Sequence, residues 1–140
     1  MKEIERKFLV LGEEWKRDIT PTLYRQAYLN SHPERTVRVR VINDQAFLTI
    51  KSKNIGITRQ EFEYAIPLDD ANVLLSLCET AVLEKYRYRI NTQHHVWEID
   101  EFIGVNQGLV IAEIELGNEH ETFVKPHWLG TEVSSDSRYY

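Results

Sequence analysis

The fold of this chain is decided by residues 37–53, which read VRVRVINDQAFLTIKSK. Apolar and polar side chains alternate there with a period of two, which is typical of β-strands that have two different faces. Arg38 and Arg40 share one face opposite a row of valines, and Lys51 and Lys53 repeat the arrangement after an Asn-Asp turn. Because successive side chains of a strand point to opposite sides, the segment predicts an antiparallel hairpin with one charged and one apolar face.

The same alternation continues outward from this hairpin in both directions. We expect eight strands, at about residues 2–11, 22–30, 34–43, 45–54, 57–67, 81–91, 94–103 and 108–117. Turn residues join most of them directly, so the strands are expected to pair as antiparallel neighbours. Three further segments read as short helices, at residues 12–18, 69–79 and 118–129. The second of these opens with Asp69-Asp70, which is good capping chemistry.

Charged side chains gather on one face of nearly every expected strand. The basic ones are Lys7, Arg38, Arg40, Lys51, Lys53, Arg59, Lys85, Arg87 and Arg89. The acidic ones are Glu3, Glu5, Glu61, Glu63, Glu98, Asp100, Glu113 and Glu115. A solvated face of an antiparallel sheet also carries alternating charge, and for any single strand this is the ordinary interpretation. It fits the whole set poorly, because most rows carry one sign and like charges side by side repel.

Rows of one sign are stable when something of opposite charge lies between them. Acidic rows favour a metal cation, and basic rows favour a polyanion. A sheet of eight strands tends to close into a barrel. We therefore expect a mainly β (α+β) fold, an eight-stranded antiparallel closed barrel with a few short helices outside. Its bore would be charged and would bind a polyphosphate together with divalent metals.

The three tryptophans are expected on the outside of such a barrel. Trp97 alternates with Glu98 and Asp100 and therefore points away from the bore. Tyr86 and Tyr88 lie on the apolar face of their strand for the same reason. The large aromatic side chains are thus expected to form the core between the barrel and its outer cover.

Composition limits the remaining possibilities. A length of 140 residues fits one domain over residues 1–140. The single cysteine, Cys78, cannot form an internal disulfide, and no Cys/His spacing suggests a zinc site. No apolar run approaches the roughly 20 residues that span a bilayer, and the start MKEIERKFLV is too charged for a signal peptide, so we expect a cytoplasmic protein. A net charge of −5 argues against duplex nucleic acid and membranes as partners.

The motif E-x-E-x-K at residues 3–7 resembles the signature of the CYTH superfamily, the triphosphate tunnel metalloenzymes. The similarity extends over nearly the whole chain and is strongest to the compact bacterial branch. It continues through YRQAYL (24–29), TVRVR (36–40), LTIKS (48–52), TRQEFEYAI (58–66), LEKYRYR (83–89), WEIDEF (97–102), IAEIEL (111–116) and GTEVSSDSRYY (130–140). The resemblance implies an eight-stranded antiparallel tunnel that hydrolyses or rearranges triphosphate compounds with Mg²⁺ or Mn²⁺.

The resemblance also implies roles for individual residues. The metal-binding positions would be Glu3, Glu5, Glu113 and Glu115, with Glu61, Glu63, Glu98 and Asp100 as supporting candidates. The catalytic and phosphate-contacting bases would be Lys7, Arg38, Arg40, Lys51, Lys85 and Arg87, and Lys53 and Arg59 would also bind substrate. Tyr28 lies where the compact branch has a tyrosine that faces the lysine at the position of Lys85, and it is added to the catalytic set.

We expect a metal-dependent triphosphatase that acts on inorganic triphosphate, with nucleoside triphosphates as weaker substrates. The charged rows suffice for a phosphate chain, and no pocket for a base or a thiamine ring is evident in the sequence. Alternatives are a class IV-type adenylate cyclase, a thiamine triphosphatase or, in another class, a non-catalytic polyphosphate-binding module. A pure anion binder would gain nothing from inward carboxylates, which argues against the last. The expected partner is a small-molecule triphosphate, with a homodimer left open.

Overall fold

The computed structural model describes residues 1–139. The strands are β1 (Lys2–Val10), β2 (Thr22–Asn30), β3 (Arg35–Ile42), β4 (Gln45–Ser52), β5 (Thr58–Ile66), β6 (Leu83–Thr92), β7 (His95–Phe102), β8 (Val110–Glu115) and β9 (Leu129–Glu132). One α-helix, α1 (Leu68–Ser76), follows β5, and 3₁₀ turns span Glu14–Lys16, Gly104–Asn106 and Ser137–Tyr139. The eight expected strands are all present, with bounds within two residues of the prediction.

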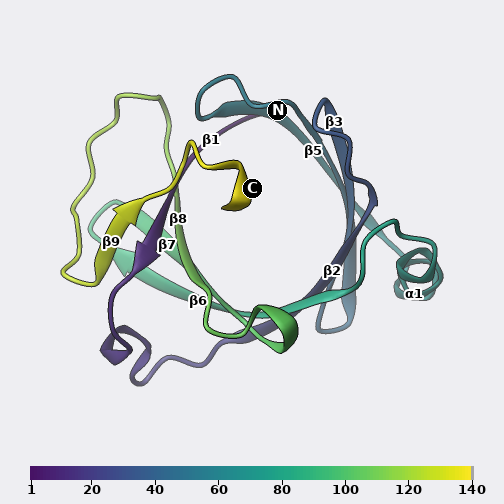
Figure 1. The fold of residues 1–140 in the computed structure, drawn as a ribbon, viewed down its shortest axis with the longest axis horizontal. Coiled ribbons are helices and arrows are strands. Elements are labelled where there is room, and N and C mark those ends of the chain that lie inside the picture. Colours follow the sequence, from purple (N-terminus) through teal and green to yellow (C-terminus); the bar gives the residue numbers. More distant parts are fainter. Residues whose placement is uncertain (140) are drawn as a thin grey trace.

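Eight of these strands close into an antiparallel barrel around a central bore (Figure 1). The order around the ring is β5-β4-β3-β2-β6-β7-β8-β1, and β1 returns to pair with β5. The closing seam is short, because only Lys2, Glu3 and Ile4 pair with β5. Farther along β1, Phe8 and Val10 pair instead with the ninth strand, β9. The prediction of a closed eight-stranded antiparallel barrel is confirmed.

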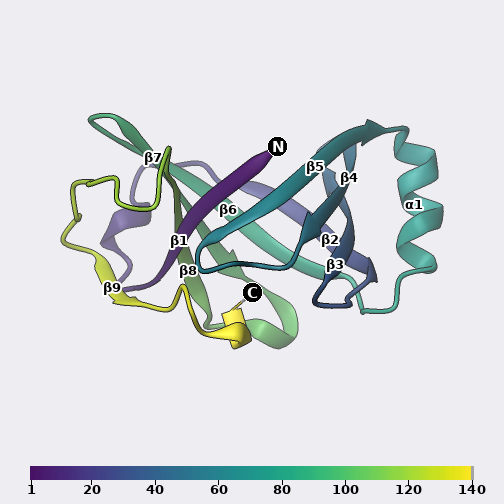
Figure 2. The ribbon, with the colours of Figure 1, turned by 90° about the horizontal axis from the view of Figure 1, so that it is seen from above.

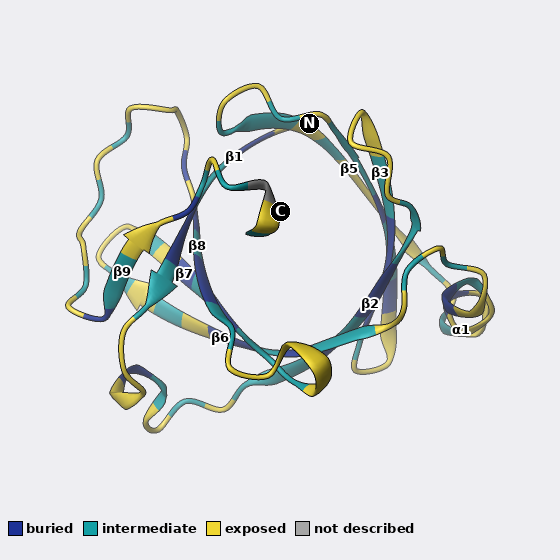
Figure 3. Cartoon of the chain, in the orientation of Figure 1, coloured by how far each residue is buried: buried dark blue, intermediate teal, exposed yellow. Residues whose placement is uncertain are grey.

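The hydrophobic core lies on the outside of the barrel rather than in its bore. One cluster covers the outer faces of β1, β6, β7 and β8, and Trp97 in it is fully buried. Trp15 and Trp128 are also buried there, and the rings of Trp97 and Trp128 meet edge to face with centroids 5.4 Å apart. The predicted exterior position of the tryptophans is confirmed. Figure 3 shows the consequence, with buried residues along the barrel strands and exposed ones mostly in the loops.

A second cluster lies under α1, which packs on the side of the barrel formed by β2, β3 and β4 (Figure 2). Ala71 and Leu75 of the helix contact Val39 and Val41 of β3. The helix begins at Leu68 after Pro67, and Asp69 and Asp70 lie in its first turn without making a side-chain cap. Their negative charges there interact favourably with the positive end of the helix dipole.

Two of the three expected helices are wrong or much reduced. In the segment 12–18 only a 3₁₀ turn at Glu14–Lys16 forms, and the indole N–H of Trp15 donates to the carbonyl of Gly12, 2.9 Å away. The segment 118–129 contains no helix and leads into β9. Pro126 removes a backbone donor there, and the Phe123 ring packs across the outer wall on Trp97, with centroids 5.6 Å apart. In residues 1–139, no helix is long and apolar enough to cross a membrane.

Candidate active site

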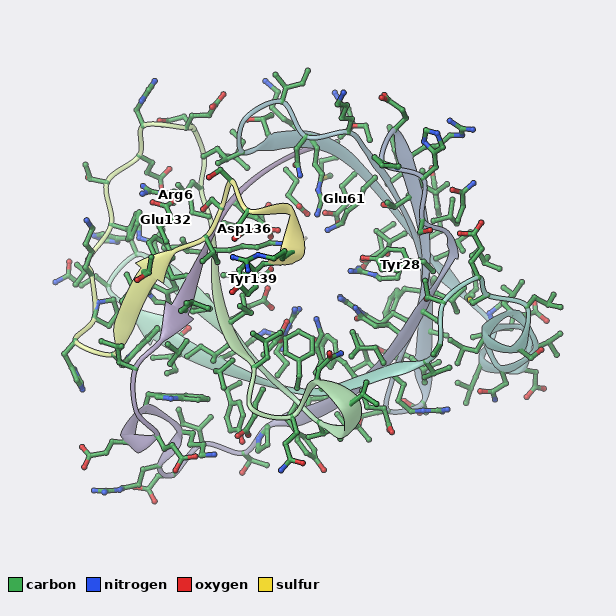
Figure 4. The ribbon with its side chains drawn as sticks, in the orientation of Figure 1. Arg6, Tyr28, Glu61, Glu132, Asp136 and Tyr139 are labelled. Carbon is green, nitrogen blue, oxygen red and sulfur yellow. The ribbon has the colours of Figure 1, made fainter. Side chains whose placement is uncertain are left out.

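The inward faces of the barrel strands enclose a cavity of about 440 Å³. It is lined by nearly every charged residue that the alternation placed on one face: Glu3, Glu5, Lys7, Arg38, Arg40, Lys51, Arg59, Glu61, Glu63, Lys85, Arg87, Arg89, Glu98, Glu113 and Glu115. Tyr28 lines it too, and Figure 4 shows Tyr28 and Glu61 pointing into the bore while Arg6 and Glu132 lie outside it. The structure therefore brings together residues from all eight barrel strands.

Strand β3 supplies a basic wall without carboxylate partners. Arg38 and Arg40 are each 8% exposed, and neither makes an ion pair within 4.0 Å among the residues described. Arg40 Nε donates to Gln26 Oε1 over 2.9 Å, and Arg38 Nη2 reaches Thr49 Oγ1 over 3.4 Å. Within the described chain, the buried Nε of Arg38 has no acceptor. Burial lowers the pKa of Arg40 to about 9, and the neighbouring charges of Arg38 and Arg87 act in the same direction.

Strands β6 and β7 supply a second basic group that is held by one buried acid. Asp100 is 1% exposed and accepts hydrogen bonds from Lys85 Nζ over 2.7 Å and from Arg87 Nε over 2.8 Å and Nη2 over 2.9 Å. Burial alone would raise the pKa of Asp100, but Lys85 and Arg87 lower it below its ordinary value. Burial lowers the pKa of Lys85 to about 8, against the attraction of Asp100. Asp100 therefore lies behind the two bases and fixes their heads, and it does not line the cavity.

A third group of mixed charge lies at the seam between β1 and β5. Glu3 accepts from Lys51 Nζ over 3.4 Å and from Arg59 Nε over 3.3 Å. Glu61 lies 3.7 Å from the same lysine nitrogen. Burial lowers the pKa of Lys51 to about 8, although the charges of Glu3 and Glu5 oppose that change. These ion pairs fix the ends of two basic side chains that reach into the bore from different strands.

The acidic wall is formed by β1 and β8. Glu5 and Glu115 are opposite each other in the antiparallel ladder, and Glu113 lies beside Lys7 and Glu98 in neighbouring ladders. Burial raises the pKa of Glu5 to about 8, and the charges of Glu113 and Glu3 add to the effect. Burial would also raise the pKa of Glu113, but Lys7, two further bases and a hydrogen bond from Glu5 lower it. Burial therefore favours the protonated form of Glu5, while the basic neighbours of Glu113 favour its ionised form.

A wall of crowded carboxylates has the donor chemistry for a hard divalent cation. The oxygens available on this wall belong to Glu3, Glu5, Glu113 and Glu115. In the described part of the chain, no three acidic, histidine or cysteine side chains are already gathered as a metal site. Ion pairs to cations hold two of the acids, since Glu3 contacts Lys51 and Arg59, and Glu5 lies 3.7 Å from Lys7.

Lys53 is the predicted site residue that lies farthest from this arrangement. Its side chain is 63% exposed and its ammonium lies 3.5 Å from Glu34. It borders a larger cavity of about 990 Å³, which shares Tyr28 and Arg59 with the bore. Lys53 is thus at a mouth of the tunnel, one step beyond Lys51 in the same row.

Several neutral residues of the bore were missed by the sequence analysis. Tyr24 and Gln26 line it from β2, four and two residues before Tyr28 in the same inner row. Tyr24, rather than Tyr28, is the cross-strand neighbour of Lys85, whereas Tyr28 lies opposite Arg38. These residues follow the same period-two alternation as the charged rows. They do not stand out in the sequence because their side chains are neutral.

Known proteins resemble this chain over nearly its whole length. The family model described as CYTH domain matches residues 1–140. An inorganic triphosphatase of Acetivibrio thermocellus is 50% identical over 139 residues, which are 99% of this chain and 89% of the relative. An inorganic triphosphatase of Nitrosomonas europaea is 34% identical over 143 residues, covering 99% of this chain and 93% of the relative.

Solved structures give the same result for the fold. The crystal structure of an inorganic triphosphatase superposes with a TM-score of 0.69 at 32% identity, covering 98% of this chain and 92% of the other. A structure of a putative adenylate cyclase from Bacillus halodurans has a TM-score of 0.66 at 18% identity, with 84% of this chain and 83% of that one covered. The second likeness shows the shared barrel and nothing more.

Proposed function

Since the chain belongs to the CYTH family, we propose that it is a divalent-metal-dependent hydrolase whose main substrate is inorganic triphosphate, with nucleoside triphosphates as weaker substrates. The observation that carries this proposal is the basic wall of β3. Arg38 and Arg40 are buried cations with no carboxylate partner among the residues described, and the Arg38 Nε has no acceptor there. Buried charges and donors of this kind are costly unless a ligand of opposite charge completes them.

The phosphate chain would be held by bases from several strands. The proposed set is Lys7, Arg38, Arg40, Lys51, Arg59, Lys85 and Arg87. Tyr28 and Lys53 lie nearer a mouth, where the exposed Lys53 would contribute little to binding. Guanidinium groups match phosphate oxygens in pairs, and ammonium groups add compact charge. Asp100 keeps Lys85 and Arg87 in place, so their positions are set before substrate arrives. Positioning and charge neutralisation are what phosphoryl transfer requires of a protein.

The carboxylates of the facing wall fit a divalent cation. Glu3, Glu5, Glu113 and Glu115 would hold it, and Glu61, Glu63 and Glu98 line the same bore as supporting acids. The bound Mg²⁺ or Mn²⁺ would supply positive charge to the phosphate chain and a more acidic water. Glu5 would release its proton when the ion binds, because the cation takes over the neutralisation that the proton provides. These carboxylates also favour an enzyme over a polyphosphate-binding module.

The partner proposed is therefore a small triphosphate and not duplex nucleic acid or a membrane. All the proposed site residues lie in one barrel domain, and a cytoplasmic location fits substrates of this kind. The homodimer stays a prediction.

The test is a product analysis with three substrates. The protein is incubated with inorganic triphosphate, ATP and thiamine triphosphate, each with Mg²⁺ or Mn²⁺, while phosphate, pyrophosphate and cyclic AMP are followed separately. We expect triphosphate and water to give one pyrophosphate and one phosphate at the highest rate. Cyclic AMP as the main product would assign a cyclase. Binding of triphosphate without product would assign a binding module.

A further inference from the structure

Strand β2 carries the one inner row without charge among the eight barrel strands of the described chain. Its inward residues are Tyr24, Gln26 and Tyr28. The strand nevertheless lies between β3 and β6, which carry the arginines and the lysine of the two basic groups. A carboxylate on β2 would neutralise those bases, and a further cation would add to their repulsion.

Tyr24 is in contact with one base from each of the two neighbouring strands. The Arg40 guanidinium lies 5.0 Å from the centre of its ring, and the Arg87 guanidinium lies 4.7 Å from it. Tyr24 itself is only 3% exposed, so both contacts are shielded from water. Cations over an aromatic ring at these distances are attracted by the negative ring face, and the attraction grows when the pair is desolvated.

The two arginines depend on the ring to different degrees. Arg87 is already fixed by two hydrogen bonds to Asp100. Arg40 has only the Gln26 oxygen and the Tyr24 ring as described side-chain partners. Without the ring, the Arg40 guanidinium would be free to turn toward the carboxylates of the bore. Paired with an acid there, it would no longer be available to bind an anionic substrate.

We propose that Tyr24 is a positioning residue for phosphate binding: its ring holds the Arg40 and Arg87 guanidiniums apart and leaves their remaining N–H groups to the phosphate chain. The inference rests on the proposed function. The ring attracts cations without carrying a charge of its own, so it orders the two arginines without competing with the substrate. The Tyr24 hydroxyl has a lesser part, because among the residues described it accepts only from Arg89, over 3.3 Å, and the Arg89 side chain is 57% exposed.

The experiment measures binding of inorganic triphosphate by calorimetry in the presence of EDTA, so that no turnover contributes. We expect Tyr24→Phe to bind within about twofold of the unchanged protein, because the ring is kept. Tyr24→Leu should bind at least tenfold more weakly, which corresponds to about 1.4 kcal/mol. With metal present, the same variant should lose activity mainly through a higher KM.

A matched control is Tyr88→Leu. Tyr88 is a buried tyrosine on the outer face of β6, with its ring against Trp15 and its hydroxyl donating to Glu101. This variant should melt at a lower temperature and still bind triphosphate as the unchanged protein does. A merely structural role of Tyr24 would give the same pattern as Tyr88.

A second series keeps the proposal testable if Tyr24→Leu does not fold. Phenylalanine and its mono-, di- and trifluorinated forms are incorporated at position 24, which weakens the negative ring face in steps with little change of shape. The dissociation constant should rise with each step. A constant value along the series, with the unchanged protein binding, would overturn the inference alone. Failure of the unchanged protein to bind at millimolar triphosphate would overturn the proposed function and the inference with it.

Discussion

The β3 wall and the wall of β1 with β8 hold their charge in opposite ways. Strand β8 is four strands from β3 in either direction around the ring and β1 is next to β8, so the two walls face each other across the bore. On β3, two buried guanidiniums have no carboxylate partner among the residues described, and burial lowers the pKa of Arg40 to about 9. On the other wall, burial raises the pKa of Glu5 to about 8, and the charges of Glu113 and Glu3 add to the effect, so the protonated form is favoured.

The difference follows from what each group can do when it is not compensated. A guanidinium cannot give up its proton at ordinary pH, so its charge stays uncompensated until an anion binds. A carboxylate can bind a proton, so its wall relieves the repulsion until a better cation replaces that proton. In the proposed function the basic wall would therefore be ready for phosphate whether or not metal is bound, and the acidic wall would lose its proton when metal binds.

Removal of the metal is expected to have the largest effect, because it removes the function of the acidic wall and leaves the basic wall unchanged. Excess EDTA should abolish turnover, and added Mg²⁺ or Mn²⁺ should restore it. The basic wall does not depend on the ion, so triphosphate should still raise the melting temperature in EDTA, by mass action on the native state. Full turnover in excess chelator would contradict the proposed role of the acidic wall.

The next largest effect is expected from Arg38→Ala and Arg40→Ala. Each should cost about 2 kcal/mol of transition-state stabilisation, or roughly thirtyfold in kcat/KM on triphosphate. Arg38→Lys should recover only part of the loss, because an ammonium cannot make the paired contact of a guanidinium. The control is Arg25→Ala, on the outer face of β2 with its side chain 43% exposed, and its kcat/KM on triphosphate should match that of the unchanged protein. Near-normal activity in both β3 variants would refute the basic wall as the substrate site.

A smaller effect is expected on the pH dependence of stability, and it should come from the acidic wall. The pKa of Glu5 is raised from 4.5 to about 8 in the folded chain. Below pH 4.5 the residue is protonated in both states and costs nothing. As pH rises toward 8 the unfolded chain loses the proton and the folded one keeps it, so stability falls. In metal-free buffer Glu5→Gln should therefore stabilise the fold at pH 9, by on the order of 1–2 kcal/mol, and hardly at pH 4.5.

Melting curves at the two pH values measure this difference. Glu84→Gln makes the same change of charge at a residue that is 45% exposed on the outer face, and it should show no such pH dependence. Equal stabilisation by Glu5→Gln at both pH values would mean that Glu5 is not a protonated acid of the empty tunnel.

The smallest effect is expected from Lys53→Ala. The side chain is 63% exposed and paired with Glu34, so water already screens its charge. We expect kcat/KM on triphosphate to stay within about twofold of normal, a change near the limit for exposed positions. A loss comparable with that of Arg38→Ala would extend the basic wall to the mouth of the tunnel.

The period-two pattern predicted most of the barrel and most of the bore, because a closed barrel with a charged interior needs the same alternation on every strand. Glu5 and Arg38, far apart in the chain, were placed in one bore by that rule alone. The pattern could not tell that Asp100 lies behind the bases, since depth within a face depends on barrel curvature and on which side chains meet. Nor does the pattern mark a neutral residue such as Tyr24.

The segment after β8 was predicted least well. Its apolar residues suggested a helix, yet Phe123 packs singly against the outer wall, and Glu121 pairs with His95 at 2.5 Å. These contacts come from distant parts of the chain and outweigh local helix preference. β9 is only four residues long and has too little alternation to show as a strand.

Strand β1 pairs with β8 along one side and with β5 and then β9 along the other, and this arrangement affects how the chain folds. Strands β2 to β5 are joined by short turns and can pair as soon as they are made, whereas β1 reaches partners as distant as Glu132, 126 residues away from Arg6. Contacts of such long range are slow to form. During that delay the sheet would be open at both edges, and the repulsion between its rows of like charge would oppose stacking with other chains. Pulsed hydrogen exchange during refolding should therefore find the amides of β1 protected last, and a tunnel built for catalysis would also protect the unfinished chain from aggregation.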